Sequence, residues 1–305
     1  MKQLLILSGK GGTGKTTVAG AFIRLSEAKA YADCDVDAPN LHLVTVQAQE
    51  PRRKAYYGLP KAEIDESKCL RCGLCREACR FRAISLEYRV DTFACEGCGV
   101  CEVVCPAQAI AMNPAQAGEL MLYTESERVF STAELSMGSG TSGMLVTEVK
   151  RQMQEASAQG SQLAVIDGSP GIGCPVIASL SGVDMVLVVA EPSISGISDM
   201  ERIVRTAQRF QTKIGVCTNK YDTNLVNAQK IEGFCQERGL PFVGRIPFDP
   251  EAVKAVNRGE TIVDVPCSSG SAVKEIFRNT LKFLFPEDAG TSHENWGLPE
   301  EAMEP

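Results

Sequence analysis

The sequence predicts an α/β protein with a doubly wound, mostly parallel sheet, into which a small α+β domain is inserted. Short apolar runs typical of buried strands alternate with helical stretches near both ends of the chain, which is the spacing of βα units. The stretch between them, residues 62–113, departs from this pattern and holds eight of the 13 cysteines. We therefore expect two kinds of domain in one chain.

The composition is that of a globular protein with an acidic end. The 305 residues carry a net charge of −7, and residues 287–305 hold six acidic side chains and no Lys or Arg. We expect this tail to be disordered. The nearly neutral remainder gives no strong signal for nucleic acid, which basic surfaces bind. No apolar run approaches the ~18 residues of a membrane helix, and the first residues are too few for a secretory signal. These features predict a cytoplasmic protein.

The first strand, Leu4–Leu7, is followed by a glycine-rich loop. From Gly9 the chain matches the pattern G-x-x-x-x-G-K-[ST], and a helix is expected over residues 19–30. In this context backbone N–H groups turn inward onto phosphate oxygens at a helix N-terminus. Lys15 is expected to reach the β- and γ-phosphates, and the Thr16 hydroxyl to hold Mg²⁺. The residues predicted to bind the nucleotide are Gly11, Gly12, Thr13, Gly14, Lys15, Thr16 and Thr17.

The string KGGTGKTT, which begins at Lys10, resembles the deviant Walker A loop of the MinD/ParA superfamily of P-loop ATPases. That superfamily also includes the nitrogenase iron protein and the Mrp-type cluster carriers. In it the additional lysine reaches phosphates bound by a partner subunit, so the resemblance implies a catalytic Lys10 and an ATP-dependent homodimer. From its position before the glycine turn, Lys10 is expected to point outward toward an external anion. A solvated loop lysine is the alternative.

Three carboxylates, Asp33, Asp35 and Asp37, lie at the end of a second predicted strand. Charges of one sign this close repel one another unless a cation or a phosphate-bound water lies between them. The resemblance implies that Asp35 is catalytic and orients the attacking water near Mg²⁺, and that Asp33 is structural. Asp37 is a weaker candidate for the site, or a turn residue before Pro39.

A further strand, Leu163–Asp167, ends in an aspartate and is followed by a loop that contains glycine. This is the pattern of a Walker B strand and switch II. Asp167 is expected to hold Mg²⁺ through water, and the Gly171 N–H to contact the γ-phosphate. An aspartate that only caps the next helix is the alternative.

Strands expected over residues 183–190, 214–218 and 242–246 complete the sheet, and the sequence NKYD begins directly after the second of them. A base pocket is expected at this edge. In the superfamily the asparagine contacts adenine, which implies this role for Asn219. The same four residues resemble the guanine-reading motif of GTPases, in which Asp222 would accept from the base. The superfamily favours ATP.

The cysteine-rich stretch is an internal repeat. Residues 69–84 and 95–110 share the spacing C-x2-C-x2-C-x3-C, a Gly and a final Ala-Ile pair. Three thiolates two residues apart can hold one iron–sulfur cluster, and the fourth points to the other. This is the pattern of bacterial two-cluster ferredoxins, and it predicts two [4Fe–4S] clusters; structural zinc and disulfides are the alternatives. The predicted ligands are Cys69, Cys72, Cys75 and Cys105 for the first cluster, and Cys95, Cys98, Cys101 and Cys79 for the second.

Along nearly its whole length the chain resembles a MinD-type subgroup with an inserted ferredoxin domain. Met144 departs from it, because the subgroup tends to have a lysine there. Cys174 lies at the offset from Asp167 at which the nitrogenase iron protein has a cluster ligand, but a buried structural thiol is favoured here. The domains that the resemblance implies are an ATPase core over residues 1–61 and 114–286, a ferredoxin domain over 62–113 and a tail over 287–305.

The expected function is that of an ATP-binding, slowly ATP-hydrolysing iron–sulfur protein. In it the nucleotide would gate electron transfer through the clusters to an unidentified redox partner protein. Two alternatives stay open. One is an iron–sulfur cluster carrier or scaffold, and the other is a ParA/MinD-like positioning ATPase whose clusters sense the redox state.

Overall fold

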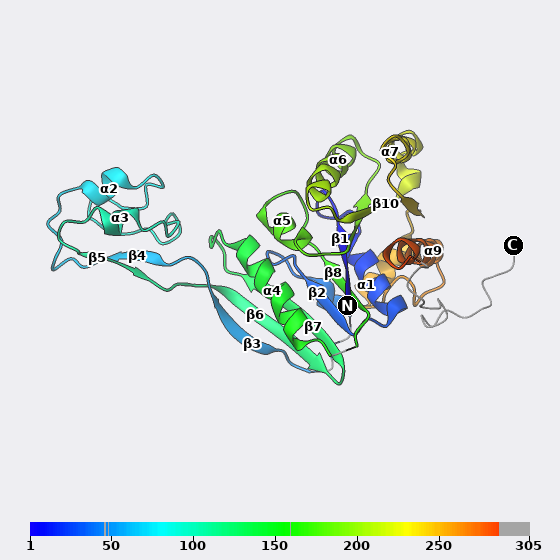
Figure 1. Cartoon of the computed structure of the whole chain (residues 1–305), viewed down its shortest axis with the longest axis horizontal. Coiled ribbons are helices and arrows are strands. Elements are labelled where there is room, and N and C mark those ends of the chain that lie inside the picture. Colours follow the sequence, from blue (N-terminus) through cyan, green and yellow to red (C-terminus); the bar gives the residue numbers. More distant parts are fainter. Residues whose placement is uncertain (46, 48, 159, 287–305) are drawn as a thin grey trace, which may run out of the picture.

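The computed structural model describes residues 1–45, 47, 49–158 and 160–286, so the predicted acidic tail lies outside the described residues. Its main body is a nine-stranded sheet in the order β11-β10-β9-β1-β8-β2-β7-β6-β3 (Figure 1). The strands from β11 to β7 run parallel, whereas β6 and β3 are antiparallel to their neighbours. The predicted α/β fold with a mostly parallel sheet is confirmed. The strands are β1 (Lys2–Leu7), β2 (Ala30–Asp33), β3 (Arg52–Tyr57), β6 (Gln116–Glu125), β7 (Arg128–Leu135), β8 (Leu163–Asp167), β9 (Met185–Ala190), β10 (Lys213–Asn219) and β11 (Phe242–Ile246).

Helices cover both faces of this sheet. The central strands β1 and β9 are buried on both sides, which explains why they read as continuous apolar runs rather than alternating ones. One face of the sheet packs against α1 (Lys15–Ser26), α8 (Pro250–Asn257) and α9 (Ser268–Leu284), and the other against α4 (Ser142–Ala156), α5 (Cys174–Leu180), α6 (Ile194–Arg209) and α7 (Leu225–Glu237). None of the described helices is long and apolar enough to cross a membrane. Short 3-10 turns occur at Leu41–Leu43 and Tyr221–Thr223.

The first helix begins and ends four residues earlier than expected: α1 spans Lys15–Ser26, whereas the sequence predicted residues 19–30. Its start follows from Gly14, whose left-handed backbone ends the loop, so that the helix begins at the next residue. Its end follows from Glu27, which is also left-handed and donates its N–H to the carbonyl of Ile23. Ala30 already belongs to β2 and is fully buried. Ala28 and Ala30, at the end of the expected helix, favour a helix by propensity, but burial of this stretch at the start of β2 outweighs that preference.

Residues 61–113 form a separate small unit with its own antiparallel sheet of β4 (Lys61–Ile64) and β5 (Ile110–Asn113). Two short helices, α2 (Leu74–Ala78) and α3 (Val100–Val103), belong to it. It has a small apolar core that includes Ala62, Ile84 and Ile110. Figure 1 shows this unit standing apart from the large sheet, beyond the ends of β3 and β6.

Candidate nucleotide site and cysteine cavities

The phosphate loop lies between β1 and α1, and two of its glycines adopt a left-handed backbone. Gly12 has φ of 78° and Gly14 has φ of 93°, a conformation that favours glycine. A Cβ at Gly14 would lie 2.2 Å from Nδ2 of Asn219, so a larger residue has no room there. Because α1 begins at Lys15, the N–H groups of its first turn face the loop, as a phosphate site requires.

Lys15 and Asp167 form a buried ion pair at this site. Nζ of Lys15 lies 2.5 Å from Oδ1 of Asp167, and the two side chains are 6% and 0% exposed. Burial alone would lower the pKa of Lys15, but the contact with Asp167 leaves it above its ordinary value. The second oxygen, Oδ2 of Asp167, is buried and has no hydrogen-bond partner. A buried acceptor of this kind is costly unless something binds it, and it fits a hydrated Mg²⁺.

The three aspartates after β2 have different surroundings. Asp33 is fully buried and accepts three backbone bonds of 2.9 Å, from the N–H groups of Asp35, Asn40 and Leu41. It therefore fixes the shape of the following loop. Asp35 is half-buried, and burial raises its pKa, whereas Asp37 is exposed. The charges of Asp35 and Lys15 interact, so Asp35 lies near the phosphate loop.

Asp33 is expected to make the folding stability of the protein fall between about pH 4 and pH 7. Burial, and next the charge of Asp167, raise the pKa of Asp33 from 3.8 to about 7. Between these values the folded protein holds a proton that the unfolded chain has lost, so stability falls as the pH rises through this window. The difference in unfolding free energy between wild type and Asp33→Asn should follow this slope in urea titrations. A difference that is the same at every pH would contradict it.

The loop after β8, which we call switch II (residues 168–174), folds back onto β1. Gly171 has φ of 92° and donates its N–H to the carbonyl of Ser8 at 3.1 Å. The Ser169 hydroxyl donates to the carbonyl of Cys34. A contact between the Gly171 N–H and a phosphate would therefore require the bond to Ser8 to open.

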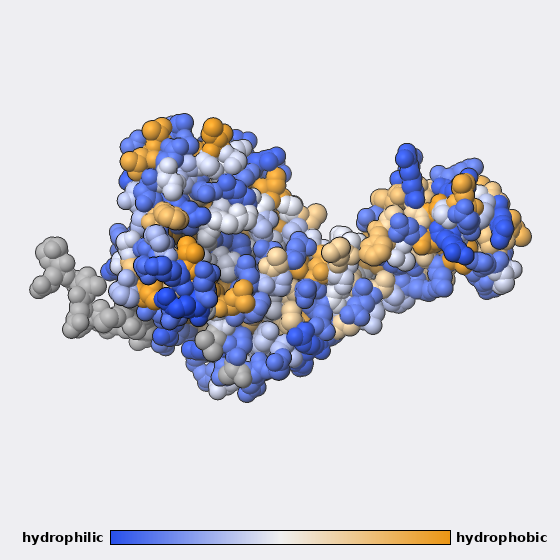
Figure 2. All heavy atoms as spheres, turned by 180° about the vertical axis from the view of Figure 1, so that it is seen from behind, coloured by the Kyte–Doolittle hydropathy of each residue, from blue (hydrophilic) through white to orange (hydrophobic). Residues whose placement is uncertain are grey.

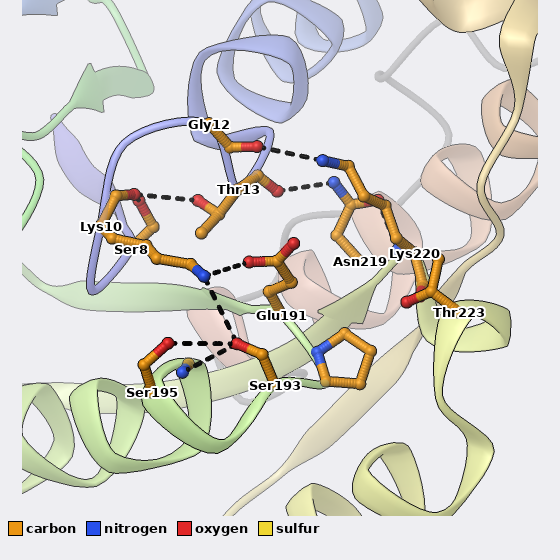
Figure 3. Close-up of polar contacts among 12 residues, drawn as sticks. Ser8, Lys10, Gly12, Thr13, Glu191, Ser193, Ser195, Asn219, Lys220 and Thr223 are labelled. Atoms are coloured by element: carbon orange, nitrogen blue, oxygen red, sulfur yellow. Dashed lines mark hydrogen bonds and ion pairs between the residues drawn. The ribbon is translucent and has the colours of Figure 1, made fainter.

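In the single chain, Lys10 pairs with an anion of its own chain, and its expected contact with an external anion stays a prediction. Its Nζ lies 2.7 Å from Oε2 of Glu191 and donates to Oγ of Ser193 at 3.3 Å (Figure 3). Glu191 directly follows β9, which pairs with β1, so the register of the sheet brings this carboxylate beside the loop. The pair is partly exposed, with Lys10 39% and Glu191 24% accessible.

The base end of the site is formed by the loops after β10 and β11. Asn219 donates from Nδ2 to the Thr13 carbonyl at 2.6 Å, and Lys220 donates from Nζ to the Gly12 carbonyl at 3.1 Å (Figure 3). A cavity of about 240 Å³ opens beside Asn219, with Phe248 among the residues on its wall. Asp222 is exposed and accepts from the N–H of Phe248 at 2.8 Å, and it is absent from the wall of this cavity.

The eight cysteines of the small unit line two cavities. Each cavity takes three cysteines from one repeat and the fourth from the other, which is the grouping of the predicted ligand sets. The first is lined by Cys69, Cys72, Cys75 and Cys105, and the second by Cys79, Cys95, Cys98 and Cys101.

Backbone groups point at the fourth cysteine of each repeat. The N–H of Ala83 donates to Sγ of Cys79 at 3.4 Å, and that of Ala109 to Sγ of Cys105 at 3.3 Å. Hydrogen bonds to sulfur tune iron–sulfur ligands in this way. Within the described ranges no three His, Cys, Asp or Glu side chains are placed to hold a metal ion. The ligands of a cubic cluster bind separate iron atoms, however, so they need not meet at one point.

The cysteines outside the small unit differ in exposure. Burial raises the pKa of Cys34 and Cys217 to about 12 and that of Cys235 to about 11, as for structural thiols. Cys174 is exposed, so the expectation of a buried thiol was wrong. It is the first residue of α5, and in the same turn Val176 is fully buried whereas Ile177 is exposed. Met144 is also exposed, in the first turn of α4.

The sequence matches the CbiA family, the CobQ/CobB/MinD/ParA nucleotide binding domain, over residues 4–262. The chain belongs to this family. An uncharacterized protein of Methanocaldococcus jannaschii, MJ0578, is 30% identical over 92% of this chain and 97% of its own length. The septum site-determining protein MinD of Helicobacter pylori is 29% identical over 38% of this chain and 48% of its own length.

Solved MinD structures share the fold. The cell division ATPase MinD of Pyrococcus furiosus superposes with a TM-score of 0.57 at 17% identity, covering 92% of this chain and 99% of that one. MinD of Pyrococcus horikoshii, solved in complex with Mg-ADP, gives 0.56 at 18% identity and covers 92% and 96%. The P-loop ATPase part of the sequence interpretation is therefore confirmed at the level of the family.

Two contacts of this family member were not predicted from its sequence. One is the pair of Lys10 with Glu191, and the other is the bond from Lys220 to the Gly12 carbonyl. Glu191 could have been found, because it directly follows an apolar run, and ligand sites of doubly wound sheets gather at the carboxyl ends of strands. The bond from Lys220 depends on how two distant loops meet, which no local pattern encodes.

Proposed function

We propose that this family member binds and slowly hydrolyses ATP, and that ATP gates electron transfer through two [4Fe–4S] clusters held by residues 62–113. The observation that carries the proposal is the presence of two kinds of site on one chain. A buried Lys15–Asp167 pair lies beside a phosphate loop, and two cavities are each lined by four cysteines. The first arrangement suits phosphoryl transfer and the second suits one-electron transfer.

The base end of the site favours adenine over guanine. Recognition of guanine by a motif of this kind needs a carboxylate that faces the base. Here one oxygen of Asp222 holds the Phe248 N–H, and Asp222 is not on the cavity wall. Asn219 is on that wall. Its Nδ2 donates to the Thr13 carbonyl and its Oδ1 accepts from the Lys220 N–H, so one N–H and one lone pair remain for a base. The relative solved with Mg-ADP agrees with this choice.

Nucleotide binding would rearrange the partners of Lys15. The phosphates would replace Asp167 as the anion that holds Lys15, and both oxygens of Asp167 would then be available to a hydrated Mg²⁺, together with the Thr16 hydroxyl. Asp35, two residues beyond the fixed carboxylate of Asp33, would orient the attacking water. Catalysis of this kind depends on positioning, and we expect turnover by the isolated protein to be slow.

We expect ATP to join two copies of the chain, with Lys10 reaching the phosphates of the other subunit. For this, Lys10 has to leave Glu191, with which it is paired in the monomer. The internal pair therefore opposes dimerisation.

Replacing Glu191 by Gln should strengthen ATP-dependent dimerisation. A partly exposed ion pair contributes about 0.2–1 kcal/mol, and a symmetric dimer opens two of them, so the dimer constant should improve by up to about 30-fold at low salt. Sedimentation of the protein with Mg-ATP measures this. Glu201→Gln, which removes an exposed pair with Arg205 on α6, is the matched control and should change nothing. A weaker dimer in Glu191→Gln would contradict the role given to this pair.

The residues of the small unit fit the proposed clusters. Bound clusters of this type would supply one-electron transfer, commonly at low potential. The chain would provide the eight thiolates, the N–H donors of Ala83 and Ala109, and an apolar core around Ala62 and Ile84 that limits the access of water. The electron acceptor would be a separate redox partner protein.

Electron paramagnetic resonance of the anaerobically purified, reduced protein tests the proposed function. Spectra would be recorded in a potential titration with and without Mg-ATP. We expect signals from two clusters, and a shift in potential or line shape when the nucleotide binds. Two signals that do not respond to bound nucleotide would contradict the gating, and a protein reconstituted with iron and sulfide that shows no cluster signal would contradict the electron-transfer function altogether.

A positioning ATPase with redox-sensing clusters is the second candidate, because relatives of this chain are named as septum site-determining MinD proteins. That function requires ATP-dependent binding to a large surface. Sedimentation with liposomes or with DNA, in the presence and absence of ATP, separates the two candidates. Pelleting that does not depend on ATP would count against positioning, whereas transfer of clusters to an apo-acceptor protein would favour the carrier function.

A further inference from the structure

Residues 135–143, which we call the bridging segment, connect β7 to the first turn of α4 and contact the loops on both sides of the nucleotide site. At one end, Leu135 donates its N–H to the carbonyl of Val36 at 2.9 Å, and Val36 lies between Asp35 and Asp37. At the other end, a Cβ at Gly143 would lie 3.2 Å from both Cβ and the carbonyl oxygen of Cys174. The segment is thus packed closely against the last residue of switch II.

The middle of the bridging segment contacts the small unit. Gly138 has φ of 78°, and a Cβ there would lie 2.8 Å from Cδ1 of Phe93, so the ring lies directly against the glycine. Gly140 has φ of 64°, and a Cβ there would lie 3.4 Å from Oε2 of Glu96. Both glycines hold left-handed conformations, which fix the path of the segment between its two ends.

These contacts lead to the second cysteine cavity. Phe93 and Glu96 lie on either side of Cys95 in the chain, and Glu96 itself lines that cavity. Lys61, at the start of β4, donates to the carbonyl of Cys95 and holds the same stretch from the other side. The wall of the first cavity includes neither Phe93 nor Glu96.

Around this contact the two parts of the molecule are separated. A groove of about 740 Å³ lies between them, with Phe93 and Met137 among the residues on its wall. Figure 2 shows that the molecule narrows between the core and the small unit. Phe93 remains 72% exposed although its ring touches Gly138. The contact can therefore tighten or open without disturbing a packed core.

We propose that the bridging segment transmits the nucleotide state selectively to the second cysteine site, formed by Cys79, Cys95, Cys98 and Cys101. The inference rests on the proposed function, because it takes ATP as the ligand that moves the switches. Displacement of Val36 or Cys174 displaces the segment to which both are joined, and the segment carries that displacement to Phe93 and Glu96. Coupling of this kind needs a continuous set of contacts that differ between two states.

Backbone hydrogen exchange tests the proposal and needs no loaded cluster. The full chain would be compared with and without Mg²⁺ and a slowly hydrolysed ATP analogue. We expect residues 33–41 and 168–174 to become protected, and with them residues 136–143 and 92–97, the last by about fivefold or more, the lower range of allosteric couplings. In Phe93→Ala, residues 136–143 should still respond and the response of residues 92–97 should be much smaller, because only the contact of Gly140 with Glu96 remains.

Leu86→Ala is the matched control, since it truncates an apolar side chain of the small unit that is 71% exposed. It should behave as the wild type does. If residues 33–41 respond while residues 92–97 do not, the inference is wrong and the nucleotide part of the proposed function stands. A response at residues 92–97 that is undiminished in Phe93→Ala also overturns it. If residues 33–41 show no added protection with the ATP analogue, the proposed nucleotide binding is wrong, and the inference, which rests on it, is wrong too.

Discussion

Replacing Lys15 by Met is expected to abolish ATP hydrolysis and to destabilise the folded protein at the same time. The proposed function uses Lys15 to bind the phosphates, and losing one preorganised cation at a charge that develops in the reaction costs about 10²-fold in rate or more. The same change leaves Asp167 fully buried with no counter-charge. Removal of one partner from a buried pair costs about 3–5 kcal/mol, which urea unfolding and a phosphate-release assay would measure side by side.

The double variant Lys15→Met, Asp167→Asn separates the two effects. It removes both charges, so it should recover much of the lost stability while hydrolysis stays absent. Lys2→Met is the surface control, because its pair with Asp184 is partly exposed, and it should change stability by less than about 1 kcal/mol. If Lys15→Met unfolds at the wild-type urea concentration, the pair does not hold the site together as the geometry indicates.

Features encoded over a few residues were predictable from the sequence. The phosphate loop needs particular residues at fixed spacing, and Gly14 must be glycine because of its left-handed backbone and the closeness of Asn219. The parallel strands followed from apolar runs that are buried on both faces. The spacing of the cysteines likewise predicted the two groups that line the cavities.

Features that depend on distant contacts were not predictable. The antiparallel strands β3 and β6 carry exposed or half-buried polar residues and weak patterns, and their pairing with each other and with β7 is decided by contacts across the sheet. Lys10 can pair with Glu191 of its own chain or with an anion outside the chain. The sequence does not say which of the two Lys10 prefers. The exposure of Cys174 depends on where α5 begins relative to α4, which only the packing of the two helices decides.

Replacing Cys105 by Ala is expected to damage the first cluster, although Cys105 belongs to the second repeat. In the structure it lines the cavity of Cys69, Cys72 and Cys75, and the N–H of Ala109 points at its sulfur. A cluster without its fourth ligand is lost or incomplete, so the iron content should fall by up to about half. The resonance signal that disappears in Cys105→Ala should be the one that disappears in Cys69→Ala.

The reciprocal variant makes the test specific. Cys79→Ala should remove the signal that Cys95→Ala removes, because these two cysteines line the second cavity. Cys235→Ala, which changes a buried thiol of the ATPase core, should leave the iron content unchanged. If Cys105→Ala and Cys95→Ala lose the same signal, each repeat binds its own cluster and the pairing across repeats is wrong. In Cys105→Ala the remaining signal comes from the second cluster, whose cavity is lined by Glu96. If the bridging segment reaches this cluster, that signal should still respond to Mg-ATP.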